Sequence, residues 1–333
     1  MRLALDLSSL TSGHRVRGLG FYTQRLKTEL EKIFSLELFG FDQQPAQTVD
    51  LVHYPAFTLF TLPPRKPICP FVVTVHDLIP LKYPQQYPLG IKGRVFWTLQ
   101  KLYLQKAAMI ITDSQASKKD IVCLTHIPAE KIEVIYLAAG EEFKPLSNPA
   151  LKLSLPKKFV LYVGDANYNK NLIHLANTCL NLGFPLVLAG KQITETDYDH
   201  QHPETKDLVE LQTLIKANPN KIFPLGFVST SDLVFLYNLA TAYVQPSLDE
   251  GFGLPALEAM ASGCPVLTSR AGSLPEICQG TDREFNSQNL KRVWQSPTLR
   301  LKMSKQGLAQ AKKFSWQKTA QQTFKVYEKI LQK

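Results

Sequence analysis

Short apolar runs alternate with longer helix-forming stretches along almost the whole chain. Such alternation favours parallel β-sheets with helices on both faces, because each crossover between parallel strands needs a connection of helix length. In the first half, strands are expected at 3–7, 35–40, 51–53, 71–75, 109–112 and 132–135, and helices at 20–33, 90–107 and 115–124. In the second half, strands are expected at 159–163, 186–189, 222–224, 242–245 and 265–269, and helices at 172–182, 206–217, 231–238 and 255–262.

The 333 residues exceed what one hydrophobic core usually supports, so two domains are expected. The segment 144–156 carries three prolines and few apolar residues, which is typical of a linker. We therefore predict an α/β protein with one Rossmann-like domain at 1–148, a second at 149–310, and a helix at 311–333 that packs back on the first domain. Open doubly wound sheets bind ligands at the carboxyl ends of their strands, so we expect the two domains to face each other across a cleft.

With 44% hydrophobic and 20% charged residues, the chain has an ordinary globular composition. No apolar run approaches the roughly 20 residues of a membrane-spanning helix, and charge interrupts the amino end too soon for a signal peptide. Five scattered cysteines without metal-ligand spacing favour reduced thiols over a disulfide framework. These features predict a cytoplasmic protein, which could also bind at the inner face of the cell membrane.

The net charge of +10 is unevenly spread. Between Lys82 and Lys119 there are seven basic residues and one acid, with aromatic residues interleaved. Such a region suits an anionic membrane surface, a phosphorylated lipid or a nucleic acid, or it is simply the solvated face of a helix. No nucleic-acid-binding motif accompanies it, so nucleic acid is the weakest of these partners.

Residues 245–263, with the sequence QPSLDEGFGLPALEAMASG, predict a strand end, a glycine turn and a helix. Pro255 suits the first helical position, where its missing N–H costs nothing. Gly263 can end the helix in a left-handed conformation. Free N–H groups at Gly253 and Leu254 would then be available to an anion or to sugar hydroxyls.

Two carboxylates flank this turn. Glu250 lies in the loop before the helix, and Glu258 lies about one turn inside it. Because carboxylates accept hydrogen bonds, the pair could hold two hydroxylated parts of one ligand. The alternative is that both glutamates are solvated side chains of an ordinary strand–turn–helix.

The first half holds two further motifs. Gly18 and Gly20 follow the first strand and precede a helix, which permits close approach of the backbone to a phosphate. His76 and Asp77 end a buried strand, where an imidazole can act near neutral pH. The alternative for His76 is a structural, hydrogen-bonded histidine.

In the second half, Lys170 precedes a helix, where a cation is unfavourable unless it serves a bound anion. From Ile222 to Ser269 there is no Lys or Arg, so few cations remain for a phosphate there. Gly226, which follows a strand, offers backbone groups that could bind the edge of a base.

The stretch 245–263 resembles the paired-glutamate motif of the retaining glycosyltransferases of family 4, which have the GT-B fold. The glycine turn at Gly18 is similar to that family's diphosphate loop in its mannosyltransferase-like members, and His76-Asp77-Leu78 is similar to its His-Asp-Leu motif. The resemblance implies a metal-independent hexosyltransferase without cofactor, in which cations replace Mg²⁺. Its substrates would be a nucleotide diphosphate sugar and a glycan or polyprenyl-linked acceptor.

The resemblance also implies roles for single residues. Glu258 would bind the ribose, Glu250 the sugar hydroxyls, and Lys170 the leaving diphosphate. His76 would contact the sugar near the reacting carbon, with Asp77 orienting it, so His76, Lys170 and Glu250 form the expected catalytic set. The residues expected at the donor site are Gly18, Leu19, Gly20, Asn169, Lys170, Gly226, Phe227, Val228, Glu250, Phe252, Gly253, Leu254 and Glu258.

The chain departs from the family pattern at three places. Phe21 replaces an Arg, for which Arg15 and Arg17 could compensate, and Asn169 replaces the Arg of the Gly-x-x-x-Pro-Arg-Lys-Asn pattern. After Gly280 the chain reaches its final helical stretch early, so pairing at the edge of the second sheet is in question.

Two alternatives follow from these features. A GT-B protein that binds sugar nucleotides but has impaired turnover would explain Asn169. An NADP-dependent oxidoreductase would explain the formal GxGxxA pattern at residues 251–256, with Arg270 near the 2′-phosphate, but it gives Glu250 and Glu258 no role.

Overall fold

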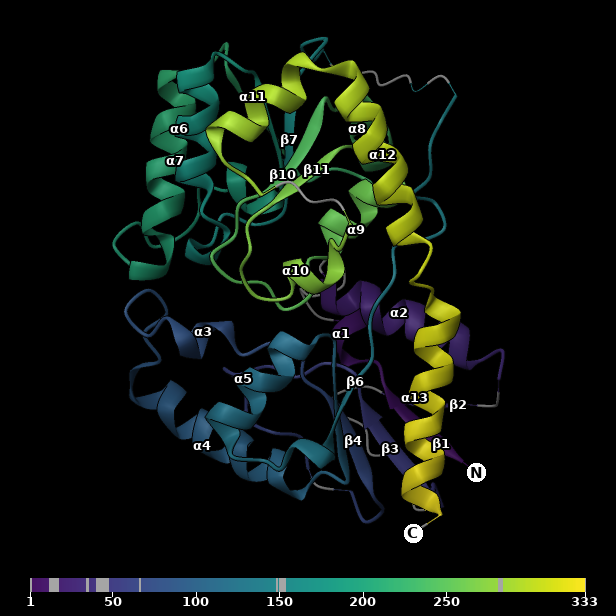
Figure 1. Ribbon diagram of the computed structural model, residues 1–333. Helices are drawn as coiled ribbons and strands as arrows, with labels where there is room; N and C mark the ends of the chain where they lie inside the picture. The colour runs from purple at the N-terminus through teal and green to yellow at the C-terminus, as the bar shows by residue number, and fades with distance from the viewer. Residues whose placement is uncertain are drawn as a thin grey trace. The chain divides into compact units, whose positions relative to one another are not determined.

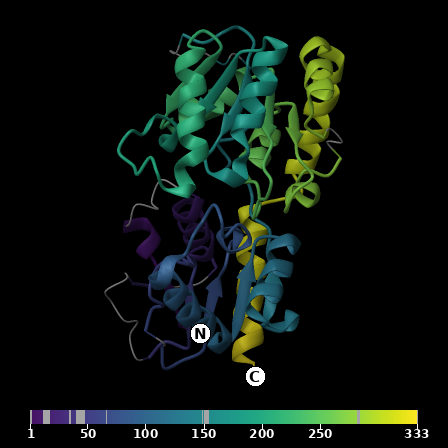
Figure 2. The same cartoon turned by 90° about the vertical axis from the view of Figure 1, so that its left-hand side faces the viewer.

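The computed structural model describes residues 2–11, 18–33, 36–39, 48–65, 67–147, 149, 154–280 and 284–332. It consists of two compact units, each a layer of strands flanked by helices (Figures 1 and 2). Unit 1 comprises Met1–Lys82, Leu89–Ala138 and Ser315–Lys333, and unit 2 comprises Tyr83–Pro88 and Ala139–Phe314. The chain therefore changes unit at Ala138, whereas the sequence led us to expect a boundary at 148. The expected motifs at Arg15 and Arg17 lie outside the described residues.

Unit 1 is built on a parallel sheet with the strand order β2-β1-β3-β4-β5-β6. The order reverses between β1 and β3, which is the switch point of a doubly wound sheet. Strands β1, β3, β4 and β5 are buried along their whole length, as expected when helices cover both faces. The strands are β1 (Leu3–Asp6), β2 (Leu36–Phe39), β3 (Leu51–Tyr54), β4 (Phe71–Thr74), β5 (Met109–Thr112) and β6 (Ile132–Val134).

Helices of unit 1 include one from the far end of the chain. Tyr327 of that helix, α13, lies 2.6 Å (Oη to Nδ1) from the buried His53, and Thr319 donates to the carbonyl of Tyr136 at 2.7 Å. The terminal helix is thus part of the core of unit 1. The helices are α1 (Ser8–Thr11), α2 (Gly18–Leu30), α3 (Ile79–Lys82), α4 (Gly90–Lys106), α5 (Gln115–Thr125) and α13 (Trp316–Leu331), with a 3₁₀ turn η1 (Ala129–Lys131).

Unit 2 is built on a second parallel sheet, with the strand order β11-β10-β7-β8-β9. Here the order reverses between β7 and β10, which are neighbours in the sheet. A short bridge from Thr268 to Glu284 extends the β11 edge, which is all the pairing that the described residues show after Gly280. The strands are β7 (Val160–Val163), β8 (Leu186–Ala189), β9 (Ile222–Gly226), β10 (Ala242–Gln245) and β11 (Val266–Thr268).

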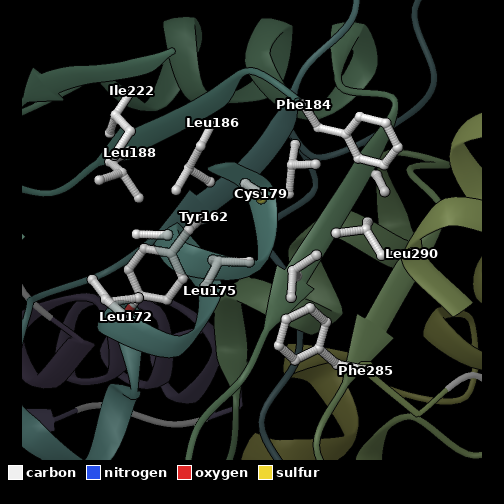
Figure 3. Packing of buried hydrophobic residues seen from close by; sticks show 14 of the residues in the cluster. Tyr162, Leu172, Leu175, Cys179, Phe184, Leu186, Leu188, Ile222, Phe285 and Leu290 are labelled. Atoms are coloured by element: carbon white, nitrogen blue, oxygen red, sulfur yellow. The ribbon is translucent and has the colours of Figure 1, made fainter. Parts of the chain in front are cut away.

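The period-two alternation of the strands builds the core of unit 2. Tyr162, Leu186 and Leu188 face a cluster that also contains Leu175 of α6 and Leu290 of α11 (Figure 3). The neighbouring strand residues Leu161, Val187 and Ala189 are also buried, so helices cover the other face too. The helical elements are η2 (Tyr168–Lys170), α6 (Leu172–Leu182), η3 (Lys191–Thr194), η4 (Pro203–Thr205), α7 (Lys206–Ala217), α8 (Thr230–Leu239), α9 (Leu254–Ala261), α10 (Leu274–Ile277), α11 (Ser287–Gln295) and α12 (Pro297–Ala311).

Every expected strand is present, with ends that differ by at most two residues. The fold is thus the predicted pair of Rossmann-like doubly wound domains. The tail beyond Pro297 is two helices, because the Ser315 hydroxyl accepts from the N–H of Lys318 and starts α13 anew. In the described part of the chain, no helix combines the length and the apolarity that crossing a bilayer requires.

Candidate functional site

The candidate site of unit 2 lies at the switch point of its sheet. Strands β7 and β10 run parallel and side by side, so the loops that leave their carboxyl ends emerge together. The first loop leads through η2 into α6, and the second leads into α9. This is the position where doubly wound sheets bind ligands.

Hydrogen bonds join these two loops. The N–H of Leu248 donates to the carbonyl of Asn169 at 2.7 Å, and the Asn169 amide donates to the carbonyl of Asp249 at 3.1 Å. The Asn171 amide donates to the carbonyl of Pro246 at 3.1 Å. Asn171 has φ +56°, a left-handed conformation that Asn tolerates better than most residues. The asparagines therefore fix the geometry in which Lys170 meets the β10 loop.

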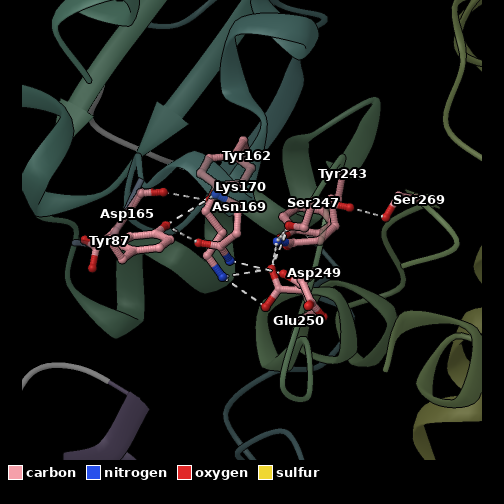
Figure 4. Close-up of polar contacts among 11 residues, drawn as sticks. Tyr87, Tyr162, Asp165, Asn169, Lys170, Tyr243, Ser247, Asp249, Glu250 and Ser269 are labelled. Atoms are coloured by element: carbon pink, nitrogen blue, oxygen red, sulfur yellow. Dashed lines mark hydrogen bonds and ion pairs between the residues drawn. The ribbon is translucent and has the colours of Figure 1, made fainter. Parts of the chain in front are cut away.

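Glu250 lies at the centre of this arrangement (Figure 4). Its carboxylate is buried and accepts from Lys170 Nζ at 2.8 and 2.9 Å. Gln245 and Ser247 donate to the same carboxylate oxygen, at 2.6 and 2.7 Å. A carboxylate with this many donors is held in one orientation. Lys170, whose side chain is 21% exposed, keeps one edge toward solvent.

Buried phenols surround Glu250. Burial, and then the Glu250 carboxylate, raise the pKa of Tyr162 well above 10. The pKa of Tyr243 is raised likewise, by burial first and then by Tyr162 and Glu250. Both remain protonated at physiological pH, and Tyr243 donates to the amide oxygen of Gln245. Gln245 in turn presents its amide N–H to Glu250, so the orientation of the amide is fixed from both sides.

The start of α9 follows this network. Gly253 has φ +86° and accepts the first helical hydrogen bonds, while its N–H and that of Leu254 donate to no other described residue. A side chain at Gly253 would contact Leu274 at 2.8 Å. Pro255 is the second residue of the helix and not the first, as the sequence had suggested, whereas Gly263 follows the helix end with φ +77°, as expected. The two predicted free donors are thus present beside the loop of Glu250.

Glu258 lies one turn into α9 and is half-buried. It accepts a hydrogen bond from Tyr237 Oη at 3.2 Å. Burial, and then Glu258, raise the pKa of Tyr237 well above 10, so this phenol remains a donor. Phe252 is buried beside this turn, with its ring 6.2 Å from that of Phe314.

The expected base-binding loop lies at the end of β9. Gly226 has φ +64°, and a side chain there would meet Thr194 Oγ1 at 2.6 Å, so glycine is required. Phe227 is 60% exposed, which is unusual for a large apolar side chain, and Val228 is half-buried. An exposed ring is available for stacking on a planar group.

Unit 1 holds the other expected residues. Helix α2 begins at Gly18 itself, so Gly18, Leu19 and Gly20 form its first turn, where backbone N–H groups lack intrahelical partners. Gly18 is exposed and Gly20 is buried. The glycines thus lie in a helix start rather than in the loop before it.

His76 follows β4, and its ring is held from both sides. Nδ1 bonds to the Asp113 carboxylate, and Nε2 lies 3.2 Å from the carbonyl of Pro55. Both partners can only accept, so the ring carries two N–H groups when both bonds are made. Burial lowers the pKa of His76, but Asp113, the Pro55 carbonyl and Asp77 together outweigh it, and the pKa is raised above its usual value. His76 is therefore suited to the imidazolium form rather than to a free base.

The group that orients His76 was missed in the sequence. Asp77 accepts from the N–H of Ile79 at 3.0 Å and caps α3, whereas Asp113 at the end of β5 bonds the ring. Burial raises the pKa of Asp113, and the charge of His76 lowers it in part. Strands β4 and β5 pair in the sheet, which brings the residues after both strands together, and this strand order was not predicted from the sequence.

A buried polar chain lies next to His76. Tyr22 packs edge-on against the His76 ring at 4.6 Å and bonds to Thr74, which also bonds to Nε2 of His53 at 2.9 Å. Burial, and then the charge of His76, lower the pKa of His53 to about 3, so His53 stays neutral. The pKa values of His53 and His76 are thus shifted in opposite directions, because of these two only His76 has a carboxylate partner among these contacts.

In unit 2 the structure gathers Asn169, Lys170, Glu250 and the start of α9 into one network. Gln245, Ser247 and Gly272 also belong to it and were not expected. Gly272 has φ +56°, and a side chain there would lie 2.5 Å from the backbone N and O of Glu250. Its signal was a glycine soon after a strand, which sequence alone does not separate from other turn glycines.

Two family models match the chain. The model described as glycosyl transferases group 1 matches residues 143–285, and Glycosyltransferase Family 4 matches residues 21–139. Together they cover the greater part of both units, and they favour a glycosyltransferase over the oxidoreductase alternative.

Curated relatives include mannosyltransferases of Escherichia coli. O-antigen chain mannosyltransferase B is 33% identical over 279 residues, which are 77% of this chain and 70% of that protein. The serotype-specific mannosyltransferase WbdA is 31% identical over 289 residues, which are 81% of this chain but 34% of that protein. The chain thus matches about a third of the length of WbdA.

Solved structures share the fold at low identity. The sucrose-phosphate synthase of Thermosynechococcus elongatus aligns with a TM-score of 0.75 at 17% identity, covering 99% of both chains. HepE of Anabaena, solved in complex with UDP and glucose, aligns with a TM-score of 0.72 at 20% identity, covering 98% of this chain and 99% of that one.

Proposed function

The chain belongs to glycosyltransferase family 4, with the GT-B fold. We propose that it transfers a hexosyl group from a nucleotide diphosphate sugar with retention of configuration. The acceptor we propose is a glycan or a polyprenyl-linked sugar. The observation that carries the proposal is the ion pair between half-buried Lys170 and buried Glu250, beside the free N–H groups of Gly253 and Leu254, at the switch point of unit 2. Mannose is the first sugar to test, because relatives of this chain are named as mannosyltransferases.

The donor diphosphate would be bound by the positive N-terminal end of a helix and by a cationic side chain. When the bond between the sugar carbon and the diphosphate breaks, the leaving group gains negative charge, and fixed donors near it lower the barrier. Lys170 donates to both carboxylate oxygens of Glu250, and its positive charge would attract an oxygen of the diphosphate. The start of α9 at Leu254 would add N–H groups and a positive dipole end.

We propose that the two glutamates divide the recognition of hydroxyls. Glu258, one turn inside α9, would accept from the ribose, while Glu250 and the N–H groups that follow it would hold the sugar. Gly226, Phe227 and Val228 would lie against the base, with the exposed Phe227 ring as a stacking surface.

In unit 1 we propose that His76 acts on the transferred sugar through the positive charge of its ring. Both ring nitrogens face acceptors in the structure, so the proton-rich form is favoured. This role requires no abstraction of a proton by the ring. It differs from the neutral, poised imidazole that a sequence motif alone suggests.

The acceptor part of the proposal is supported by the surface of α4. Ile91, Val95, Leu99 and Leu102 are 86%, 53%, 39% and 50% exposed, and their spacing places them on one side of the helix. The helix also carries Lys92, Arg94, Lys101 and Lys106 and no acidic residue. We propose that this face binds an anionic membrane, where a polyprenyl-linked acceptor would reside.

Part of the basic region serves the fold instead. Lys82 pairs with Asp120 at 2.8 Å, Lys101 donates to the carbonyl of Leu124, and Lys118 donates to that of Ile132. The membrane proposal therefore narrows from the whole region between Lys82 and Lys119 to the outer face of α4. No feature of this face favours nucleic acid.

The impaired-turnover alternative is favoured by one observation, the neutral Asn169 in place of a cation. A melting-temperature screen against GDP-, UDP-, ADP- and dTDP-sugars tests binding, because a ligand that binds the native state raises the melting temperature. Incubation of the best donor with a glycan or polyprenyl-linked acceptor, followed by NMR of the product anomer, tests transfer and retention. Binding without transfer would favour the alternative, and an inverted product would contradict retention.

A further inference from the structure

Tyr87 bonds to the residue that departs from the family pattern. Its hydroxyl donates to Asn169 Oδ1 at 2.8 Å and accepts from the Asn169 N–H at 3.4 Å (Figure 4). Both residues are about 5% exposed. Tyr87 comes from Tyr83–Pro88, the short segment that precedes α4 in the sequence but belongs to unit 2.

The other side of Asn169 bonds to the β10 loop. Its amide N–H donates to the carbonyl of Asp249, and its own carbonyl accepts from Leu248. The same segment adds Tyr83, whose ring packs against Tyr168 at 5.5 Å and whose hydroxyl donates to Leu248 at 3.3 Å. Asn169 is thus bonded on every side by groups of unit 2, and it precedes Lys170 directly.

From these contacts we propose that Tyr87 is a positioning residue that acts through Asn169, holding Lys170 and the β10 loop in the geometry that binds the donor diphosphate. This inference rests on the proposed function. In this inference Asn169 is part of a buried structural link. The position at which the family pattern has a cation is therefore not an empty phosphate-binding position in this chain. The space beside Lys170 is filled by a phenol and an amide whose hydrogen bonds are satisfied by each other.

The test compares Tyr87→Phe with Tyr198→Phe. Tyr198 offers a matched control because its hydroxyl donates to the amide oxygen of Gln212 at the same 2.8 Å, away from these loops. Each change removes one hydroxyl and keeps the ring. The first measurement, hydrogen exchange of the Leu248 amide, needs no ligand. Tyr87→Phe is expected to speed this exchange about fivefold, the effect of losing about 1 kcal/mol of local stability, and Tyr198→Phe to leave it unchanged.

The second measurement is the affinity for GDP-mannose and UDP-glucose, titrated separately. For the probe that the wild type binds, Tyr87→Phe is expected to weaken binding about fivefold. The double variant with Lys170→Met is expected to bind no worse than Lys170→Met alone, because Tyr87 acts through that lysine. Unchanged exchange at Leu248, or fully additive losses in affinity, would overturn the inference.

Asn169→Arg restores the residue of the family pattern and gives the sharpest contrast. A buried link predicts faster exchange and weaker binding, because a guanidinium cannot replace the amide between Tyr87 and Asp249. Tighter binding with unchanged exchange would overturn the inference and identify a phosphate subsite. If the wild type binds none of the GDP-, UDP-, ADP- and dTDP-sugars, the proposed function is at fault, and the exchange measurement still decides whether Tyr87 holds the loop.

Discussion

Glu250 is a buried carboxylate whose charge is balanced by Lys170, and this pair governs what the site can bind. Four hydrogen bonds hold the carboxylate, two of them from the lysine. Removing one member of a buried ion pair destabilises the fold by more than the intact pair stabilises it, because the remaining charge loses its partner. The pair is therefore the point at which stability and donor binding are linked.

Lys170→Met is expected to lower the free energy of unfolding by about 1–3 kcal/mol, because Glu250 keeps its burial and loses its cation. Donor affinity is expected to fall as well. Chemical denaturation measures the first effect, and Lys82→Met is the control. Lys82 pairs with Asp120 at the same 2.8 Å but in a more exposed setting, so its loss should cost less than about 1 kcal/mol. Equal losses in both variants would contradict this account of Lys170.

Asp113→Asn is expected to move the titration of His76 to lower pH. In the wild type, the raised pKa means that the pair stabilises the fold fully below the ordinary histidine pKa. That contribution is lost as the pH rises through the raised value in the folded protein. Without the carboxylate, burial lowers the pKa of His76 and this pH-dependent stability disappears.

NMR titration of the His76 ring measures the effect directly. Asp77→Asn is the control, because Asp77 is the weakest of the influences that raise the pKa of His76. It should produce a smaller shift in the same direction. An unmoved midpoint in Asp113→Asn would contradict the role assigned to Asp113.

At the residue scale, the sequence identifies side chains whose type and spacing are unusual. Glu250, Glu258 and Lys170 fall in this class, since each is a charge beside a predicted helix start. Asp113 and Tyr87 do not, because their partners depend on strand order and on which unit a short segment joins. Nothing local to either residue indicates the contact.

Among the elements, the loop after β11 supports Glu250 by close backbone packing. Gly272→Ala is expected to destabilise the protein well beyond Gly183→Ala. Both glycines have positive φ, so both substitutions carry a conformational cost of about 1–2 kcal/mol. Only Gly272 has the Glu250 backbone within 2.5 Å of the new methyl, whereas nothing lies within 4 Å at Gly183. Thermal denaturation of the two variants checks this. Equal decreases in melting temperature would contradict it and would show that the loop shifts to accommodate the methyl group.

Helix α4 is the element on which membrane binding would depend. Ile91→Glu is expected to reduce cosedimentation with vesicles of anionic phospholipid by about tenfold or more, since it places a charge in the apolar face. Leu301→Glu on α12 is the control, because Leu301 is 58% exposed on another surface. A parallel measurement with vesicles of zwitterionic lipid separates the contribution of charge to membrane binding from that of apolar contact. Equal binding of both variants to anionic vesicles would contradict the proposal.

The elements themselves were largely predictable. Strands are short apolar runs between turn residues, and the long helices have strong helix-forming composition, so both are visible in the sequence. Helices such as α1 and α3 are too short to show a period, and they form because neighbouring structure supports them. The break between α12 and α13 depends on the cap at Ser315, which resembles many other serines.

For the whole molecule, alternation of strands and helices was enough to predict two doubly wound sheets. It could not predict that Tyr83–Pro88 joins unit 2, because no local pattern states which surface a segment buries. The terminal helix was expected to return to the first domain, and its Tyr327 bonds the buried His53 of that unit. A buried histidine in the middle of a strand was the missed sign that a polar partner had to come from elsewhere.

The most direct measurement is calorimetric titration of the nucleoside diphosphate, and then of its sugar, into Glu258→Ala and Glu250→Ala. Glu258→Ala is made in a Tyr237→Phe background, with Tyr237→Phe as its control, so that no buried phenol is left without an acceptor. The account predicts that loss of Glu258 weakens both ligands about tenfold or more, the effect of about 1.4 kcal/mol. Loss of Glu250 should weaken only the sugar-bearing ligand, since Glu250 is proposed to hold the sugar hydroxyls and not the nucleotide. Unchanged affinity of both ligands in the Glu258 variant would contradict the central claim that these two glutamates recognise the donor.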